Sequence, residues 1–207
     1  MAHADVLKAQ RTQRRQRARE GSQSAKDNDI HVSTSAVEER ARRVRLILLD
    51  VDGVLTDGTV LMHGDGTESK AFHIRDGAAI VWAMQAGVEV GLLSARASAA
   101  TTQRAAQLGM RIVAQGVPSK PLEFDRILAE HRVAEENVAY MGDDLLDLPV
   151  LARAGLAGAP ADAAEEVRAA SHWVSALGGG RGAVREFIEL VLRAQERWDG
   201  IVRDFSA

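Results

Sequence analysis

The apolar positions of this chain fall into short runs that alternate with segments of helical periodicity. The run at 44–49, interrupted only by Arg45, predicts a strand that is buried on both faces. The same pattern predicts strands at 88–93, 111–114, 138–141, 156–159 and 172–174, and helices at 76–83, 98–109, 121–131, 145–154, 163–169 and 182–197. Strands that alternate with helices in this way predict an α/β fold, Rossmann-like, with a mostly parallel sheet flanked by helices.

Between the first strand and the first helix, the pattern changes to two short strand-like segments. They cover 58–62 and 69–74, and the glycine-rich stretch 63–67 separates them. This arrangement predicts a β-hairpin. Asp76 is the predicted N-cap of the helix that follows, because its side chain can accept hydrogen bonds from the first turn.

The first 43 residues differ in composition from the rest of the chain. Arg and Gln crowd 11–19, and 21–29 is polar and poor in apolar residues, so we expect a disordered or loosely helical extension over 1–43. Two alternatives are a nucleic-acid-binding arm and a solvated tail or upstream start. No aromatic residues are interleaved with the arginines, which favours the tail. Residues 44–207 then form one domain.

The overall composition narrows the function classes. A net charge of -3 gives no general attraction to nucleic acid or to anionic membranes. The chain has no cysteine, which excludes disulfides, thiolate zinc sites and a cysteine nucleophile. No apolar run approaches the roughly 18 residues of a membrane span, and no signal-peptide core follows Met1. We therefore expect a cytoplasmic protein with no membrane or nucleic-acid partner.

Polar residues suited to one task follow several predicted strands. Asp50 and Asp52 come directly after the first strand, where ionised groups lose hydration and need compensation. Ligands of open α/β sheets bind at this end of the strands. The other groups at strand or helix ends are Ser94, Lys120, Asp143 and Asp144. Carboxylates, a hydroxyl, an ammonium and glycine amides predict a magnesium–phosphate site.

Aspartate suits phosphoryl chemistry because it is ionised at neutral pH and needs no general base before it attacks phosphorus. Attack forms an acyl-phosphate and splits one difficult hydrolysis into two easier steps. Asp52, two residues from Asp50, can protonate the leaving alkoxide and then deprotonate water. A magnesium ion makes attack of one anion on another possible.

Four ordered motifs carry a resemblance to a known superfamily. Asp50-Val-Asp-Gly-Val-Leu-Thr-Asp-Gly, Ser94, Lys120 and Gly142-Asp-Asp-Leu-Leu-Asp resemble the motifs of the haloacid dehalogenase (HAD) superfamily. Further segments at 72–77, 142–150, 160–163 and 179–186 resemble the 3-deoxy-D-manno-octulosonate 8-phosphate (KDO 8-phosphate) phosphatases. This narrower resemblance covers roughly 43–195.

The resemblance implies a capless phosphatase, in which the hairpin replaces the usual cap domain and four subunits close each other's active sites. It implies magnesium-dependent hydrolysis of KDO 8-phosphate to KDO and phosphate through an aspartyl-phosphate, in lipopolysaccharide precursor synthesis. The alternative is a related phosphatase of another sugar-acid phosphate, such as a nonulosonate 9-phosphate. The C-terminal segment after Gly180 is expected to reach toward a neighbouring site.

The resemblance also implies a role for each matching residue. Asp50 is the expected nucleophile and a metal ligand, and Asp52 is the expected acid/base and binds metal through its backbone carbonyl. The other expected roles are metal ligation by Asp143, support by Asp144 and Asp147, phosphate binding by Gly53, Ser94, Ala95 and the catalytic Lys120, and binding of a substrate carboxylate by Arg75. The chain departs from the family where Ser94-Ala95-Arg96 replaces Thr-Gly-Arg, and in its segment 197–205.

Other interpretations of these residues stay open. A calcium loop at Asp50 would need an acidic or amide residue at Val54 and Glu at Leu61, and has neither. A phosphoacceptor receiver domain is another alternative. In such a domain the acceptor aspartate ends a middle strand, whereas Asp50 follows the first strand. Taken without the resemblance, Asp147 is an ordinary solvated carboxylate of a helix's first turn. The remaining alternatives are a helix cap for Asp143 or Asp144, a surface charge for Lys120, an ion pair with Asp76 for Arg75, and either a functional or a surface role for Arg181 and Arg185.

Overall fold

The computed structural model describes residues 35–206, and contacts divide the chain after Ala36. In the second unit, which begins at Val37, six strands form one sheet in the order β5-β4-β1-β6-β7-β8, with every strand parallel to its neighbours. The strands are β1 (Leu46–Leu49), β4 (Glu89–Ser94), β5 (Ile112–Gln115), β6 (Val138–Met141), β7 (Leu156–Ala159) and β8 (Trp173–Val174). The predicted parallel α/β sheet is confirmed.

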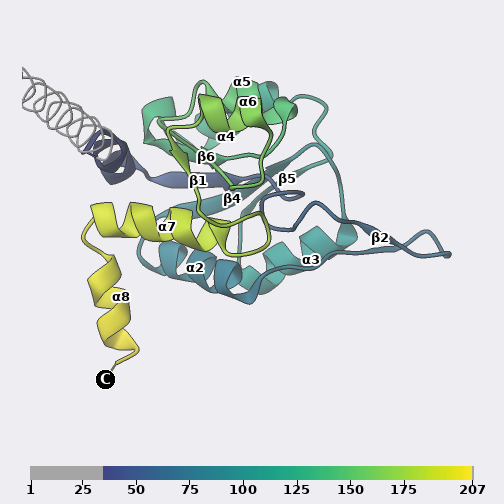
Figure 1. The fold of residues 1–207 in the computed structure, drawn as a ribbon, viewed down its shortest axis with the longest axis horizontal. Coiled ribbons are helices and arrows are strands. Elements are labelled where there is room, and N and C mark those ends of the chain that lie inside the picture. Colours follow the sequence, from purple (N-terminus) through teal and green to yellow (C-terminus); the bar gives the residue numbers. More distant parts are fainter. Residues whose placement is uncertain (1–34, 207) are drawn as a thin grey trace, which may run out of the picture. The chain divides into compact units, whose positions relative to one another are not determined.

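Helices cover both faces of this sheet (Figure 1). One face carries α2 (Ile74–Gln85), α3 (Ala99–Leu108) and α7 (Ala183–Ala194), and the other carries α4 (Lys120–His131), α5 (Leu148–Leu151) and α6 (Glu165–Ala170). Each face has its own buried apolar cluster, one around Phe187 and one around Phe124. Among the described residues, none of the helices combines the length and the apolar character that crossing a bilayer requires.

The N-terminal boundary of the domain was predicted at residues 43/44. Residues 37–43 are helical, and Ala41 within them is fully buried in the core cluster of α7. The Gln195 side chain donates hydrogen bonds to the carbonyls of Ala41 and Val44 and holds this segment against the C-terminal part of the domain. Residues 1–34 of the predicted extension lie outside the described residues.

Three helix predictions need correction. α2 begins after His73, and Asp76 lies inside its first turn as a buried acceptor of the Arg185 backbone N–H. The helix predicted at 145–154 is a 3₁₀ turn over Leu145–Asp147 followed by the short α5, since Asp147 turns inward and Pro149, at the start of α5, has no N–H to bond the Leu145 carbonyl. The helix predicted at 182–197 ends at Ala194.

A further helix that the sequence pattern did not predict, α8 (Trp198–Asp204), folds back onto the domain. Trp198 is only 6% exposed, and its ring packs edge-on against Trp82 of α2 at 5.9 Å. The Arg185 guanidinium lies 4.5 Å from the Trp82 ring and 4.9 Å from the Trp198 ring. Such cation–π contacts, with the buried ring, hold α8 against its own chain.

The predicted hairpin is present but short. Strands β2 (Leu61–Met62) and β3 (Glu68–Ser69) pair antiparallel, and together they form the only sheet structure of the described chain between β1 and α2. The segment after Ser69 runs to α2 without regular structure, although it was predicted as strand to residue 74. The hairpin that was expected in place of a cap domain thus lies between β1 and α2.

A glycine loop from the C-terminal part of the domain packs against the loop that follows β1. The Gly180 N–H donates to the Val54 carbonyl at 2.9 Å. Gly179 is buried, and a Cβ at this position would lie 1.8 Å from the Gly53 carbonyl oxygen. Only glycine permits this approach, so the loop after β1 depends on residues far along the chain.

We expect Gly179→Ala to destabilise the domain by about 1–3 kcal/mol or more, because the added methyl must push two backbones apart. Urea unfolding followed by circular dichroism measures this. The control is Gly64→Ala at the hairpin tip, where a Cβ meets nothing within 4 Å, and this variant should match the wild type. Equal stability of the two variants would contradict the packing argument.

Candidate active site

The carboxyl ends of β1, β4 and β6 meet at one edge of the sheet. In the register, Leu49 pairs with Leu92 on one side and Met141 on the other. Asp50, the residue that follows β1, therefore lies close to the ends of both neighbouring strands. An open cavity of about 270 Å³ lies here, lined by Asp50, Asp52, Gly58, Ser94, Ala95, Arg96, Lys120, Asp143, Asp144, Leu146 and Asp147. The predicted convergence of the strand ends is thus observed.

Lys120, at the start of α4, lies between two carboxylates. Its Nζ is 2.9 Å from Asp50 Oδ2 and 2.5 Å from Asp147 Oδ1, and its side chain is 4% exposed. Burial opposes the charge on Lys120, yet the two carboxylates outweigh it and raise the pKa of the ammonium above its usual value. Burial raises the pKa of Asp50, and the Lys120 ammonium opposes that rise. The surface-charge alternative for Lys120 is therefore wrong.

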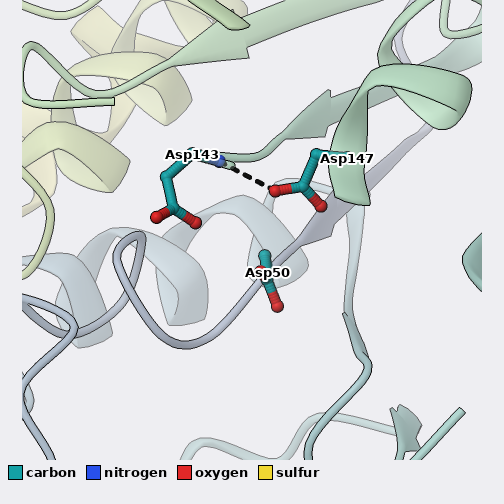
Figure 2. A group of neighbouring side chains, drawn as sticks. All are labelled: Asp50, Asp143 and Asp147. Atoms are coloured by element: carbon teal, nitrogen blue, oxygen red, sulfur yellow. Dashed lines mark hydrogen bonds between the residues drawn. The ribbon is translucent and has the colours of Figure 1, made fainter. Parts of the chain in front are cut away.

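Asp147 is fully buried, not solvated, and both its oxygens are occupied. Oδ1 accepts hydrogen bonds from Lys120 and from the Tyr140 hydroxyl, and Oδ2 accepts from the backbone N–H groups of Asp143 and Asp144. Figure 2 shows the bond from the Asp143 N–H. With four donors already bound, Asp147 has little capacity left for a metal ion, and it orders the loop that carries Asp143.

Asp144 has a different role in the same turn. It is exposed and caps the 3₁₀ turn, with its Oδ1 accepting from the Leu145 N–H at 2.8 Å. Asp147 reciprocates by accepting from the Asp144 N–H, so the two residues form a capping box. The predicted helix cap among Asp143 and Asp144 is thus Asp144.

Asp143 offers the free oxygen of the cluster. Its Oδ1 is buried and has no hydrogen-bond partner among the described residues. Burial, with the negative charges of Asp50 and Asp147, raises the pKa of Asp143 to about 7. One oxygen from each of these three residues lies within 4.8 Å of the others (Figure 2). An unpaired buried carboxylate oxygen among oxygen donors fits a hard divalent cation such as Mg²⁺.

The loop after β1 approaches Asp143 very closely. Gly53 has φ +83°, and a Cβ there would lie 1.9 Å from Asp143 Oδ2. Glycine is thus required both for the left-handed conformation and for the space. Gly53 itself does not line the cavity, whereas Gly58 does.

Asp52 turns toward the hairpin. Its Oδ1 is 2.5 Å from Lys70 Nζ, and its Oδ2 is 3.9 Å from the nearest Arg96 nitrogen. Sequence analysis missed Lys70, because a single lysine beyond a hairpin strand carries no motif. It also assigned no role to Arg96, although this residue completes the motif that begins with Ser94 and lines the cavity.

The remaining predicted residues are distributed between the cavity and the surface. Ser94 is buried at the cavity wall, and Ala95 is exposed beside it. Arg75 is exposed on the first turn of α2, outside the cavity lining, and forms no ion pair with Asp76 in the described part of the chain. Arg181 lies 3.3 Å from Asp57, and Arg185 is held by Trp82, Trp198 and Glu189.

Comparison with known proteins gives relatives that share one description. The chain is 42% identical over 163 residues to the 3-deoxy-D-manno-octulosonate 8-phosphate phosphatase KdsC of Escherichia coli BL21-DE3, covering 79% of this chain and 87% of the relative. It is 40% identical over 164 residues to KdsC of Yersinia pestis, covering 79% and 88%. No protein-family model matches the chain.

Solved structures agree with these relatives. The phosphatase of the same description from Moraxella catarrhalis, in complex with magnesium, phosphate and KDO, has a TM-score of 0.80 and 34% identity, and the match covers 82% of this chain and 97% of the other. The Yersinia pestis structure has a TM-score of 0.79 and 40% identity, covering 80% and 89%.

We expect Asp147→Asn to lower the free energy of unfolding by about 2–3 kcal/mol, because Lys120 loses one of its two buried carboxylate partners and keeps only Asp50. An amide also cannot accept from four donors, because one of its two polar atoms is itself a donor. Urea unfolding of the metal-free protein measures the loss.

The matched control for that variant is Asp144→Ala, which removes an exposed cap in the same turn and should cost only about 1 kcal/mol. An Asp147→Asn variant no less stable than this control would contradict the supporting role.

Proposed function

Because the chain belongs to the KDO 8-phosphate phosphatase family of the HAD superfamily, we propose that it hydrolyses KDO 8-phosphate to KDO and inorganic phosphate. The observation that carries the proposal is the cavity at the ends of β1, β4 and β6, where carboxylates, Lys120 and the Ser94 hydroxyl face one open space. The reaction belongs to lipopolysaccharide precursor synthesis.

Asp50 is the nucleophile in this proposal. An Asp50 oxygen forms a bond to phosphorus, and the bond from phosphorus to the sugar oxygen breaks. Asp52, at the cavity wall, gives a proton to the departing sugar oxygen. In the second step Asp52 takes a proton from water as the water oxygen attacks phosphorus and frees Asp50.

Asp50, Asp143 and the Asp52 backbone carbonyl are the proposed Mg²⁺ ligands. Asp147 is assigned to support, because its oxygens are already occupied by four donors. When bound, Mg²⁺ neutralises charge between the phosphate and the carboxylates and orients the phosphate for attack. Lys120, the Ser94 hydroxyl, and the loops at Gly53 and Ala95 hold the phosphate oxygens.

Two arginines are candidates for the substrate carboxylate. A guanidinium binds a carboxylate with two parallel hydrogen bonds. Arg96 lines the cavity of its own chain, with its side chain 42% exposed. Arg75 stands outside this lining, so it would serve a substrate held between neighbouring subunits.

The exposed surface of the hairpin supports the proposal of a homotetramer. Leu61 and Met62 of β2 are each 61% exposed, and both strands of the two-stranded sheet are edge strands that can pair with another chain. We propose that hairpins of neighbouring subunits associate and help to close the open cavities. The cytoplasmic location stays a prediction.

The substrate assignment is tested with a panel of phosphates in the presence of Mg²⁺. We expect kcat/KM for KDO 8-phosphate to exceed that for hexose 6-phosphates by at least about tenfold, because a charged hydrogen-bond pair contributes ~1.5–3 kcal/mol. Arg96→Ala or Arg75→Ala should narrow this ratio while leaving p-nitrophenyl phosphate hydrolysis closer to the wild type.

Asp50→Asn is the control and should hydrolyse none of these substrates. A preference for a nonulosonate 9-phosphate would keep the mechanism and change the substrate. Normal turnover by Asp50→Asn would overturn the mechanism itself.

The metal assignment predicts opposite effects of one substitution with and without Mg²⁺. Asp143→Asn removes a crowded negative charge, so its Tm without metal should exceed that of the wild type. Saturating Mg²⁺ at about 100 times its Kd should raise the wild-type Tm by about 5–10 °C and leave that of Asp143→Asn unchanged.

Differential scanning calorimetry gives both melting temperatures. Asp144→Asn keeps a capping side chain in the same turn and should retain the response to Mg²⁺. A Mg²⁺-dependent rise in Asp143→Asn as large as in the wild type would exclude Asp143 as a ligand.

A further inference from the structure

Lys70 makes the closer of the two ion pairs that Asp52 has in the described chain. Its Nζ lies 2.5 Å from Asp52 Oδ1, within hydrogen-bond distance of a charged pair. The Lys70 side chain is only 1% exposed, whereas the Asp52 side chain is 25% exposed. One oxygen of Asp52 is therefore anchored from the protein side while the carboxylate as a whole still reaches solvent.

Lys70 does not bind substrate directly. It is absent from the cavity lining, to which Asp52 belongs, and its ammonium is covered by protein. A lysine that is buried behind a reactive carboxylate can act only through that carboxylate.

The second oxygen of Asp52 remains available for chemistry. The Arg96 guanidinium lies 3.9 Å from Oδ2, which is too far for a hydrogen bond. Arg96 is instead paired with Glu68 of β3. The segment at β3 thus makes two separate ion pairs, Glu68 with Arg96 and Lys70 with Asp52. Only the second pair holds Asp52.

We propose that Lys70 is a positioning residue, which holds Asp52 Oδ1 so that Oδ2 faces the oxygen that leaves phosphorus. This inference rests on the proposed function. In the first step, Asp50 bonds to phosphorus, the bond between phosphorus and the bridging oxygen breaks, and that oxygen takes the proton from Asp52 Oδ2. In the second step, a proton of the attacking water returns to the same oxygen as the phosphorus–Asp50 bond breaks.

Comparing substrates with a poor and a good leaving group distinguishes this positioning role from a merely structural one. A sugar alkoxide is a poor leaving group and needs the proton, whereas p-nitrophenolate is a stable anion and leaves without it. The first step determines kcat/KM for both substrates, so a misplaced proton donor affects only the alkyl phosphate.

The test measures kcat/KM of the full-length protein with Mg²⁺ on the alkyl phosphate that the wild type hydrolyses best and on p-nitrophenyl phosphate. Lys70→Met should lower the first value by about 100-fold and the second by less than about tenfold, as expected for impaired general acid catalysis. Lys70→Arg, which keeps the charge, should restore most of the loss.

Arg111→Met is the matched control, because it removes a cation that is paired with Glu89 outside the cavity lining and leaves Asp52 anchored. It should keep the wild-type ratio between the two substrates. Lys70→Gln is measured beside Lys70→Met, and thermal melts compare the folding of all variants.

Equal losses on both substrates in Lys70→Met and Lys70→Gln, or a wild-type ratio in both, would overturn the positioning role. A wild-type protein that hydrolysed no phosphate monoester would instead refute the proposed function, so the two failures are distinguishable.

Discussion

The buried ammonium of Lys120 is the interaction on which the rest of the site depends. It stands within 3 Å of both Asp50 and Asp147, and without it two carboxylates would be buried side by side with no counter-charge. Charge pairs in a protein interior are costly to desolvate and become favourable only when the geometry and the surrounding hydrogen bonds are good. In this site the Tyr140 hydroxyl and two backbone N–H groups complete the set.

The carboxylates at this edge of the sheet differ in how many of their oxygens are already engaged. Asp147 is saturated, and Asp143 keeps one buried oxygen unpaired among the described residues. Asp50 has both oxygens engaged: Oδ1 accepts from the Val51 N–H of its own loop, and Oδ2 pairs with Lys120. The surroundings of each aspartate thus decide how many further hydrogen bonds or metal contacts its oxygens can make. Carboxylates of one chemical type can therefore serve different roles in one site.

The periodicity of the sequence was sufficient to predict the sheet and the convergence of Asp50, Ser94 and Asp143, because parallel strands bring their carboxyl ends together. It could not predict the burial of Asp147, since that depends on Lys120 arriving from α4. Lys70 was missed for the same reason: its partner lies on another segment, and no spacing along the chain encodes it. Helix α8 was not predicted, because its stabilising contact, Trp198 against Trp82 of α2, joins residues that are far apart in the sequence.

The docking of the glycine loop has a consequence for how the protein is made. The loop that follows β1 leaves the ribosome early, and domains assemble as the chain emerges. The hydrogen bond to the Val54 carbonyl comes from Gly180, so that loop stays without this packing partner until most of the domain has been synthesised. A nascent or prematurely terminated chain can therefore carry every residue of the first motif and still lack the shape that brings Gly53 against Asp143.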